Sequence, residues 1–596
     1  MNKTRTPEKE VVEYFTRYEQ PMHKQYLAMR RFLLERAPAE AVAEEFDYTV
    51  STVYTLARDF RQRLASCGAG SDPFFQTPKA GRKSAESKLD IDALVVSYRK
   101  KQLSVPDIKI IMDAKGYMLS ETLIMSICEA NGFVRLPKRG RQDRQEIMEN
   151  GKFAALAEAP AAEMLPFDTD ETFSSKGVGL LSFLPIIKYY GIDRVIENSN
   201  YPETSRIAKI NSILCFLALK LSNVERYGHD DGWCHDRGLG MFAGLNVLPK
   251  TTWYSSYSSA VSREDNLQFL RALNLGWSDC GLLSDTANLD FTTIPYWGDE
   301  GPFENNWSGK RSKALISIQA VLAQDPDQGI ICYGDTTIKH DNQDNVVLEF
   351  LDFYHSDPSI DSHLKYLVFD SKFTTMENLG RLDDKGIKFL TIQRKSKALD
   401  EYISNIPPDK WKTVRIKKAN HKSRLVTCAE RITVNDSYGK TRKIRQIFIK
   451  GSKIKPVTII TNDFDSKVED IVQKYARRWL VETEISEHIH FFHLNRNSSG
   501  IVVKVDFDFT MTILAHNLYR VLAMNLKGYS HYDAKSLFNQ FIDNYGEIVI
   551  KDDVVTVKLN RKRALPLLLE SLCDFDDDPY AWIGGKRIRF TPNSHT

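Results

Sequence analysis

Tyr475, Arg478 and Glu482 are spaced so that they could do chemistry together. The sequence from Val472 to Gly500 has apolar residues at three- to five-residue steps and no proline, which predicts a long helix. Offsets of zero, three and seven place the phenol, the guanidinium and the carboxylate on one stripe of that helix. The carboxylate could then bind a metal ion while its neighbours bind a phosphate. The spacing also fits an exposed Arg–Glu pair on an amphipathic helix, and spacing alone favours that simpler interpretation.

Two more acids lie at or near the ends of apolar stretches with the pattern of β-strands. These are Asp290 and Asp370. A carboxylate in such a position is costly unless it is paired or bound to a metal ion. Asp285, Asp335 and Asp383 are competing acids, but their sequence contexts are typical of turns.

The run from Tyr475 to Glu482 resembles the tyrosine–arginine–glutamate–lysine signature of bacterial insertion-sequence transposases. These are DDE transposases with a ribonuclease-H-like core. The resemblance implies that Glu482 is the third catalytic carboxylate and matches best when Asp290 and Asp370 are the first two. The position of the signature's lysine is occupied here by Ile489, so the phosphate contact of that lysine has no equivalent.

This resemblance covers roughly residues 180–526 and implies a DNA transposase that acts on the terminal inverted repeats of its own element. Three carboxylates would hold two divalent ions, Mg²⁺ or Mn²⁺, about 3.5–4 Å apart, for strand cleavage and strand transfer. Arg478 would clamp a phosphate, with Tyr475 beside it. The expected partners are double-stranded DNA, as element ends and as target, and a second copy of the chain in the DNA complex.

Two other classes of function remain open at this point. A metal-dependent DNA nuclease, or a domesticated derivative without transposition, would keep the same acids. A helix-turn-helix DNA-binding regulator would not need the three acids together, and their joint presence argues against it.

Composition favours a multidomain protein of the cytoplasm, associated with the nucleoid. A chain of 596 residues exceeds what one core supports. Its eight cysteines include no C-x-x-C pair, which indicates neither a zinc site nor a disulfide framework. The start of the chain is charged, unlike a signal peptide, and the apolar stretch from Phe507 to Leu526 carries polar residues that favour a core helix over a membrane span.

The N-terminal quarter is expected to bind DNA. Residues 1–66 have helix-turn-helix spacing, with Arg58 and Arg61 on the outer face of the second helix, which could enter a major groove. A linker with a basic run follows (67–88), then a second helix-turn-helix-like unit with a basic tail (89–146). A small helical hairpin without a DNA role is the alternative for the first unit.

The remaining sequence predicts an α/β ribonuclease-H-like catalytic core interrupted by a mostly β insertion. We expect a helical scaffold domain (147–283), the first part of the core (284–396), the insertion (397–463), the second part of the core (464–528) and a C-terminal α+β region (529–596). Strands followed by helices indicate the α/β class of the core.

The insertion is strongly basic. Residues 410–455 contain fifteen Lys and Arg against two acids, Glu430 and Asp436. Such a surplus repels itself without a polyanion, so we expect it to serve DNA rather than folding. The residues expected to contact the DNA backbone are Lys417, Lys418, Lys422 and Arg424. Trp411 could stack on an unpaired base, although a buried core tryptophan is the simpler interpretation.

Overall fold

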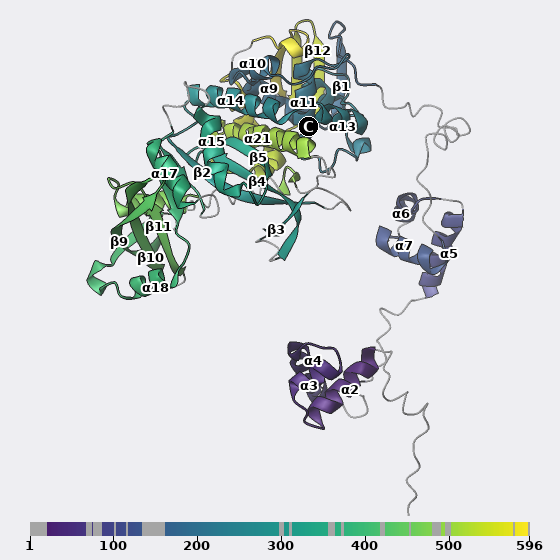
Figure 1. Ribbon diagram of the computed structural model, residues 1–596. Coiled ribbons are helices and arrows are strands. Elements are labelled where there is room, and N and C mark those ends of the chain that lie inside the picture. The colour runs from purple at the N-terminus through teal and green to yellow at the C-terminus, as the bar shows by residue number, and fades with distance from the viewer. Residues whose placement is uncertain are drawn as a thin grey trace, which may run out of the picture. The chain divides into compact units, whose positions relative to one another are not determined.

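The computed structural model is a mixed α/β, multidomain protein (Figure 1). It describes residues 21–66, 74, 86–100, 103–114, 117–133, 161–296, 303–308, 313–355, 364–370, 375–417, 423–451, 454–478, 490–494, 502–575 and 578–593. Five residues named above therefore lie outside the described residues: Lys418, Lys422, Glu482, Ile489 and Gly500. The basic runs at 79–83 and 137–144 lie outside them too. The chain divides into two units, Met1–Ala155 and Leu156–Thr596, which are taken separately below.

The described part of the first unit contains two small groups of three helices. Helices α2 (Pro21–Leu33), α3 (Ala39–Glu45) and α4 (Val50–Ser66) share a core that includes Val42 and Val53. Asp47 adopts a positive φ of 48° in the short turn between α3 and α4. Helices α5 (Glu86–Lys100), α6 (Val105–Ala114) and α7 (Glu121–Ala130) share the second core, and the Ser120 hydroxyl caps α7 as its sequence predicts.

The second unit is built on a ten-stranded sheet. Its central strands are β5 (Ile331–Ile338), β4 (Lys313–Gln324), β2 (Thr286–Pro295), β6 (Tyr366–Val368) and β7 (Lys388–Ile392), in that spatial order. The first three are antiparallel to one another, while β2, β6 and β7 are parallel. Strand β2 is buried along most of its length, which explains its nearly continuous apolar pattern.

The basic insertion continues this sheet. Its strands are β8 (Lys412–Lys417), β9 (Ser423–Ser437), β10 (Lys440–Gly451) and β11 (Ile454–Thr461), all antiparallel. Strand β11 pairs with β7, so the insertion and the core form one sheet (Figure 1). Tyr438 and Gly439 have positive φ values in the β9–β10 turn, as a two-residue hairpin turn requires.

Helix α21 (Val502–Asn525) is the central helix of this unit. It packs on β5 and on α11 (Lys209–Leu221), α13 (Thr251–Ser259) and α14 (Arg263–Asp279). Most of its residues are buried, which confirms the prediction of a core helix. Within the described ranges, no helix is both long and apolar enough to cross a membrane.

Shorter helices complete the unit. They are α9 (Phe183–Tyr189), α10 (Ile192–Asn198), α12 (Arg237–Phe242), α15 (Val346–His355), α17 (Met376–Asp384), α18 (Lys397–Ser404), α19 (Val468–Ala476), α22 (Ala534–Leu537) and α23 (Leu565–Leu572).

A second, four-stranded sheet joins segments that are distant in sequence. Strand β1 (Glu171–Ser175) pairs with β12 (Gly546–Lys551), which continues into β13 (Val554–Leu559) and β14 (Arg587–Pro592). The expectation of a purely helical scaffold misses β1, because its pairing partner lies more than 370 residues later.

Polar side chains of α14 and α21 satisfy the outer edge of β5. Asn517 accepts a hydrogen bond from the Ile331 backbone N–H and donates one to its carbonyl, both at 2.9 Å. Asn274 donates to the Cys332 carbonyl at 2.8 Å. A strand edge covered by helices needs such partners, because an unpaired buried backbone group is costly.

Replacing Asn517 by alanine should destabilise the protein more than replacing Asn274. Asn517→Ala leaves two buried backbone groups of Ile331 unpaired, at roughly 1–3 kcal/mol each, whereas Asn274→Ala leaves one. Thermal unfolding measures the stability, and hydrogen exchange of the Ile331 amide locates the effect. Equal losses of stability in the two variants would contradict this account.

Candidate active site

Asp290 lies in β2, and Asp370 lies just past the end of the neighbouring parallel strand β6. Asn288 of β2 is in register with Val368 of β6. Asp290 follows two residues later within β2, whereas Asp370 follows two residues after the last residue of β6, and the charges of both carboxylates act on Arg478. Asp290 is buried and Asp370 is half-buried. The sequence prediction that these acids belong together fits this geometry.

The end of α19 lies along β2. Three polar contacts join them: Lys474 to the Thr286 hydroxyl (3.3 Å), the Asn288 amide to the Arg477 carbonyl (3.2 Å) and Arg478 to the Asp290 carboxylate (2.9 Å). The three β2 residues alternate along the strand, so they share one face. This row of contacts places the tyrosine–arginine pair of the predicted motif above the two acids.

Electrostatics tie Tyr475 and Arg478 to both acids. The side chains of Arg478 and Asp290 are 7% and 12% exposed, so solvent is nearly excluded from their ion pair. Burial opposes the charge on Arg478, but Tyr475, Asp290 and Asp370 outweigh it and raise its pKa above the usual value. Burial raises the pKa of Tyr475 to about 12, and its ring centroid lies 5.7 Å from the Arg478 guanidinium. Tyr475 is therefore a neutral phenol at physiological pH.

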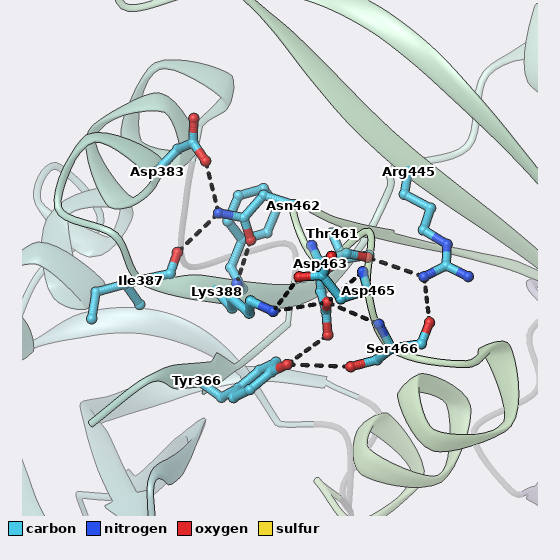
Figure 2. A network of polar contacts seen from close by, with 11 residues as sticks. Tyr366, Asp383, Ile387, Lys388, Arg445, Thr461, Asn462, Asp463, Asp465 and Ser466 are labelled. Atoms are coloured by element: carbon cyan, nitrogen blue, oxygen red, sulfur yellow. Dashed lines mark hydrogen bonds and ion pairs between the residues drawn. The ribbon is translucent and has the colours of Figure 1, made fainter. Parts of the chain in front are cut away.

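A buried polar network fixes the loop that enters α19 (Figure 2). The Asp463 carboxylate accepts hydrogen bonds from the Tyr366 hydroxyl (2.6 Å) and the Lys388 ammonium (3.0 Å). Burial disfavours its charge, yet bonds from Ser466, Tyr366 and Lys388 outweigh this and hold the pKa of Asp463 well below its usual range. Sequence reasoning missed this acid, because its partners come from separate strands.

Two neighbouring side chains extend the same network. Asn462 donates to the Asp383 carboxylate (2.9 Å) and accepts from the Phe389 backbone N–H (2.9 Å). Arg445 donates to the Ser466 carbonyl at 2.6 Å, which ties the loop to β10 (Figure 2). The start of α19 is thus held by β6, β7 and β10, while its end is held by β2.

Residues 286–518 match the family model of the transposase DDE domain. The matched span begins at the first residue of β2 and ends within α21, so it includes both aspartates and the Tyr475–Arg478 pair. This match supports a DDE transposase. No curated protein matches the chain in sequence. A solved structure that resembles it is a piggyBac transposase synaptic complex with hairpin DNA, at 12% identity and a TM-score of 0.35, covering 66% of this chain and 81% of that one.

The acids of the matched span suit a hard divalent cation. Two carboxylates that both act on the same guanidinium provide the oxygen ligands that Mg²⁺ prefers. In the described part of the chain, no group of three or more His, Cys, Asp or Glu is placed to hold a metal ion. Glu482, the third predicted ligand, lies outside that part. Asp290 and Asp370 are therefore the part of the predicted set that the structure brings together.

The predicted long helix from Val472 to Gly500 is wrong in its extent. Helix α19 starts earlier, at Val468, and ends at Ala476. Residues 491–494 are not α-helical, and His493 has a φ of 55°. Phe491, Phe492 and Leu494 are buried in the main core there, and this tertiary packing overrides the local helical pattern.

Two of the three competing acids are placed differently from the prediction: Asp285 lies in the bend before β2, but Asp383 lies in α17 and Asp335 in a strand. Asp335 does not lie in a turn: it is buried in β5, 3.3 Å from Arg263. Asp383 pairs with Arg442 at 2.5 Å, and Asp285 accepts a hydrogen bond from the Thr286 hydroxyl. Each of the three acids thus has a partner within the protein.

The expectation that the basic residues of the insertion do not serve folding is wrong for at least three of them. Arg442 and Lys440 pair with Asp384 of α17, each at 2.8 Å, and Arg445 pairs with Glu430 at 2.7 Å. All three ion pairs neutralise part of the surplus charge within the protein, and the two with Asp384 attach the β9–β10 hairpin to α17.

The other predicted DNA-contact residues are dispersed. Arg58 and Arg61 are exposed on α4 in the first unit, where Arg58 also contacts Asp59 at 3.1 Å. Arg424 is half-buried in β9, and only the backbone of Lys417 is described. Trp411 packs against the cluster of Leu399, Ala429 and Phe448, and the Lys450 ammonium lies 3.5 Å from its ring centroid. These contacts favour the core interpretation of Trp411.

The Asp463 network predicts a pH-dependent stability. Folding lowers the pKa of the Asp463 carboxyl from an unfolded-state value near 3.8. The ionised carboxylate therefore stabilises the protein at any pH above 3.8, and this contribution is lost as the pH falls through the pKa of the folded state. Asp463→Asn should therefore unfold at a lower temperature than wild type at pH 6, and the difference should shrink below about pH 4. Thermal unfolding across this pH range measures the difference in unfolding temperature.

The control is Asp465→Asn, since Asp465 is 87% exposed and also contacts Lys388. A difference that persists unchanged at low pH would contradict the assignment.

Proposed function

We propose that this protein is a DNA transposase of the bacterial insertion-sequence class. It would bind the terminal inverted repeats of its element and catalyse metal-dependent strand cleavage and strand transfer. The observation that carries the proposal is that Asp290 of β2 and Asp370, just past the neighbouring parallel strand β6, both interact with Arg478 within the span that matches the transposase DDE domain. The order β5-β4-β2-β6-β7, with an antiparallel half and a parallel half, supports a ribonuclease-H-like core.

In this proposal Asp290, Asp370 and Glu482 hold two Mg²⁺ or Mn²⁺ ions. Such ions, when bound, activate the attacking oxygen of water or of a 3′-hydroxyl and stabilise the leaving oxygen. Arg478 supplies a fixed cation beside Asp290, where it would meet a phosphate that approaches the acids. The neutral phenol of Tyr475 would donate a hydrogen bond to the same phosphate. No covalent bond between protein and DNA is required.

The first unit would recognise the element ends. We assign helix-turn-helix function to residues 1–66 and 89–146, because in each of them three helices surround a small core and α4 presents exposed arginines. The exposed cations of the insertion (397–463), including Lys417, Lys418, Lys422 and Arg424, would follow the DNA backbone beside the cut. Residues 284–396 and 464–528 form the catalytic core, residues 147–283 a scaffold, and residues 529–596 a C-terminal region. The chain would act as a homodimer on DNA, associated with the nucleoid.

Each of the three acids should be needed for cleavage. Asp290→Asn, Asp370→Asn and Glu482→Gln remove a ligand charge without changing shape, and several kcal/mol of lost metal stabilisation corresponds to at least a roughly hundredfold slower reaction. The rate of each variant is measured as strand cleavage of a plasmid that carries the element ends, in the presence of Mg²⁺. Asp285→Asn is the matched control, because that acid lies next to β2 but away from Asp370. Cleavage near the wild-type rate in any of the three variants would remove that residue from the site.

Base recognition should depend on the outer face of α4. In the full-length protein, Arg58→Ala or Arg61→Ala should weaken binding to terminal-repeat DNA by about 5- to 150-fold if the side chain reads a base edge, and binding to random duplex by less. Arg30→Ala on α2, a side chain that is 53% exposed, is the control. An equal loss on both DNAs would assign these arginines to phosphate contacts instead.

A further inference from the structure

Trp307 lies on the surface of the second unit, unlike the other tryptophans described there. Its side chain is 61% exposed, whereas Trp233, Trp277 and Trp582 are at most 5% exposed. Among the described residues, Trp253 and Trp411 are half-buried. Trp307 belongs to β3 (Glu304–Ser308), which pairs with the first part of β4 in a hairpin that projects from the sheet (Figure 1).

The hairpin presents the indole on an open face. Trp307 is opposite Ala314 and Asn305 is opposite Ile316, so these four side chains share one face. All four are exposed, and the small Ala314 side chain leaves the indole ring uncovered by its cross-strand neighbour. A large apolar side chain kept in water on a short strand is unfavourable for the isolated protein, which points to a partner.

The opposite face of the hairpin holds it in place. Asn306 is buried, donates to the Ser317 carbonyl at 3.0 Å and lies 2.8 Å from a ring nitrogen of His340. The His340 backbone N–H donates to the Glu304 carboxylate at 2.9 Å. The indole is therefore presented by an anchored strand, which lowers the entropic cost of binding through it.

The hairpin borders the edge of the sheet where the two acids lie. Strand β2 runs on from Asp290 to Pro295, and Ser317 of β4 pairs with Pro295 on one side and with Glu304 on the other. The Thr293 hydroxyl also lies 3.5 Å from the Trp307 carbonyl. Three residues of strand separate Thr293 from Asp290, or about 10 Å. DNA positioned at the acids would meet this hairpin within a few nucleotides.

We propose that the β3–β4 hairpin is a DNA-contact surface, in which the Trp307 indole stacks on an unpaired base close to the cleaved phosphate. The proposal rests on the proposed transposase function. Lys313, which precedes the cross-strand neighbour Ala314 on β4, is exposed. The one acid of β3, Glu304, is already bonded to the His340 backbone. An exposed aromatic ring on a strand pair that carries an exposed cation matches a base attached to a phosphate backbone.

The test compares Trp307→Ala, Trp307→Phe and Tyr545→Ala in the full-length protein. Tyr545 is a distant aromatic side chain that is 51% exposed, and it serves as the matched control. The probes are two duplexes of one sequence, one fully paired and one with 2-aminopurine in a short unpaired stretch. Trp307→Ala should bind the unpaired probe about 5- to 150-fold more weakly and lose the stacking-induced quenching of 2-aminopurine. Trp307→Phe should keep most of the affinity for the unpaired probe and most of the quenching. Tyr545→Ala should match wild type in both measurements.

Three results would overturn the proposal. They are unchanged affinity and quenching in Trp307→Ala, equal losses on both probes, or a change from dimer to monomer in sedimentation without a change in DNA affinity. The last result would identify the hairpin as a contact between two copies of the chain. The binding assay needs no cleavage, so it is run with wild-type protein and the Trp307 and Tyr545 variants in the absence of divalent metal ions. Failure of the stacking proposal is thus separate from failure of the proposed function, which would appear as wild-type protein that does not cleave element ends.

Discussion

The buried ion pair between Asp290 and Arg478 is the constraint on which the geometry of the site depends. A carboxylate inside a sheet loses its hydration and needs a charged partner, but such a pair adds little net stability. Removing one partner would leave an uncompensated charge, so the pair acts mainly by fixing one arrangement. Because β2 supplies the acid and the end of α19 supplies the cation, the helix must lie over the strand.

Contacts at the two ends of α19 make this arrangement rigid. At its start, Asp463 and its partners attach the entering loop to three strands, and at its end the polar side chains of β2 hold the last turn. The chain therefore leaves Arg478 from a defined point beside Asp290 and Asp370.

The sequence was informative where the pattern is local. Apolar runs predicted the central strands, the strands of the insertion and α21, and the cost of a carboxylate within such runs selected Asp290 and Asp370. It failed where distant segments decide the outcome. Strand β1 needs β12 as its partner, the Asp463 network draws on residues from four segments, and the core packing of Phe491 and Phe492 interrupts the expected helix. Asp335 was misplaced in a turn because its compensating partner, Arg263, lies 72 residues earlier.

The basic insertion illustrates why net charge alone did not assign a role to each cation. Arg442 and Lys440 pair with Asp384 and so help to attach the hairpin to α17, while Arg445 pairs with Glu430 within the hairpin. Strand β8 stands at the end of the sheet, and its exposed Lys412 and Arg415 provide the charge that protects an edge strand against pairing with another chain. Both roles exist without DNA. Only cations that have neither role would require a polyanion, and Lys418 and Lys422, which the proposed function assigns to DNA, lie outside the described residues.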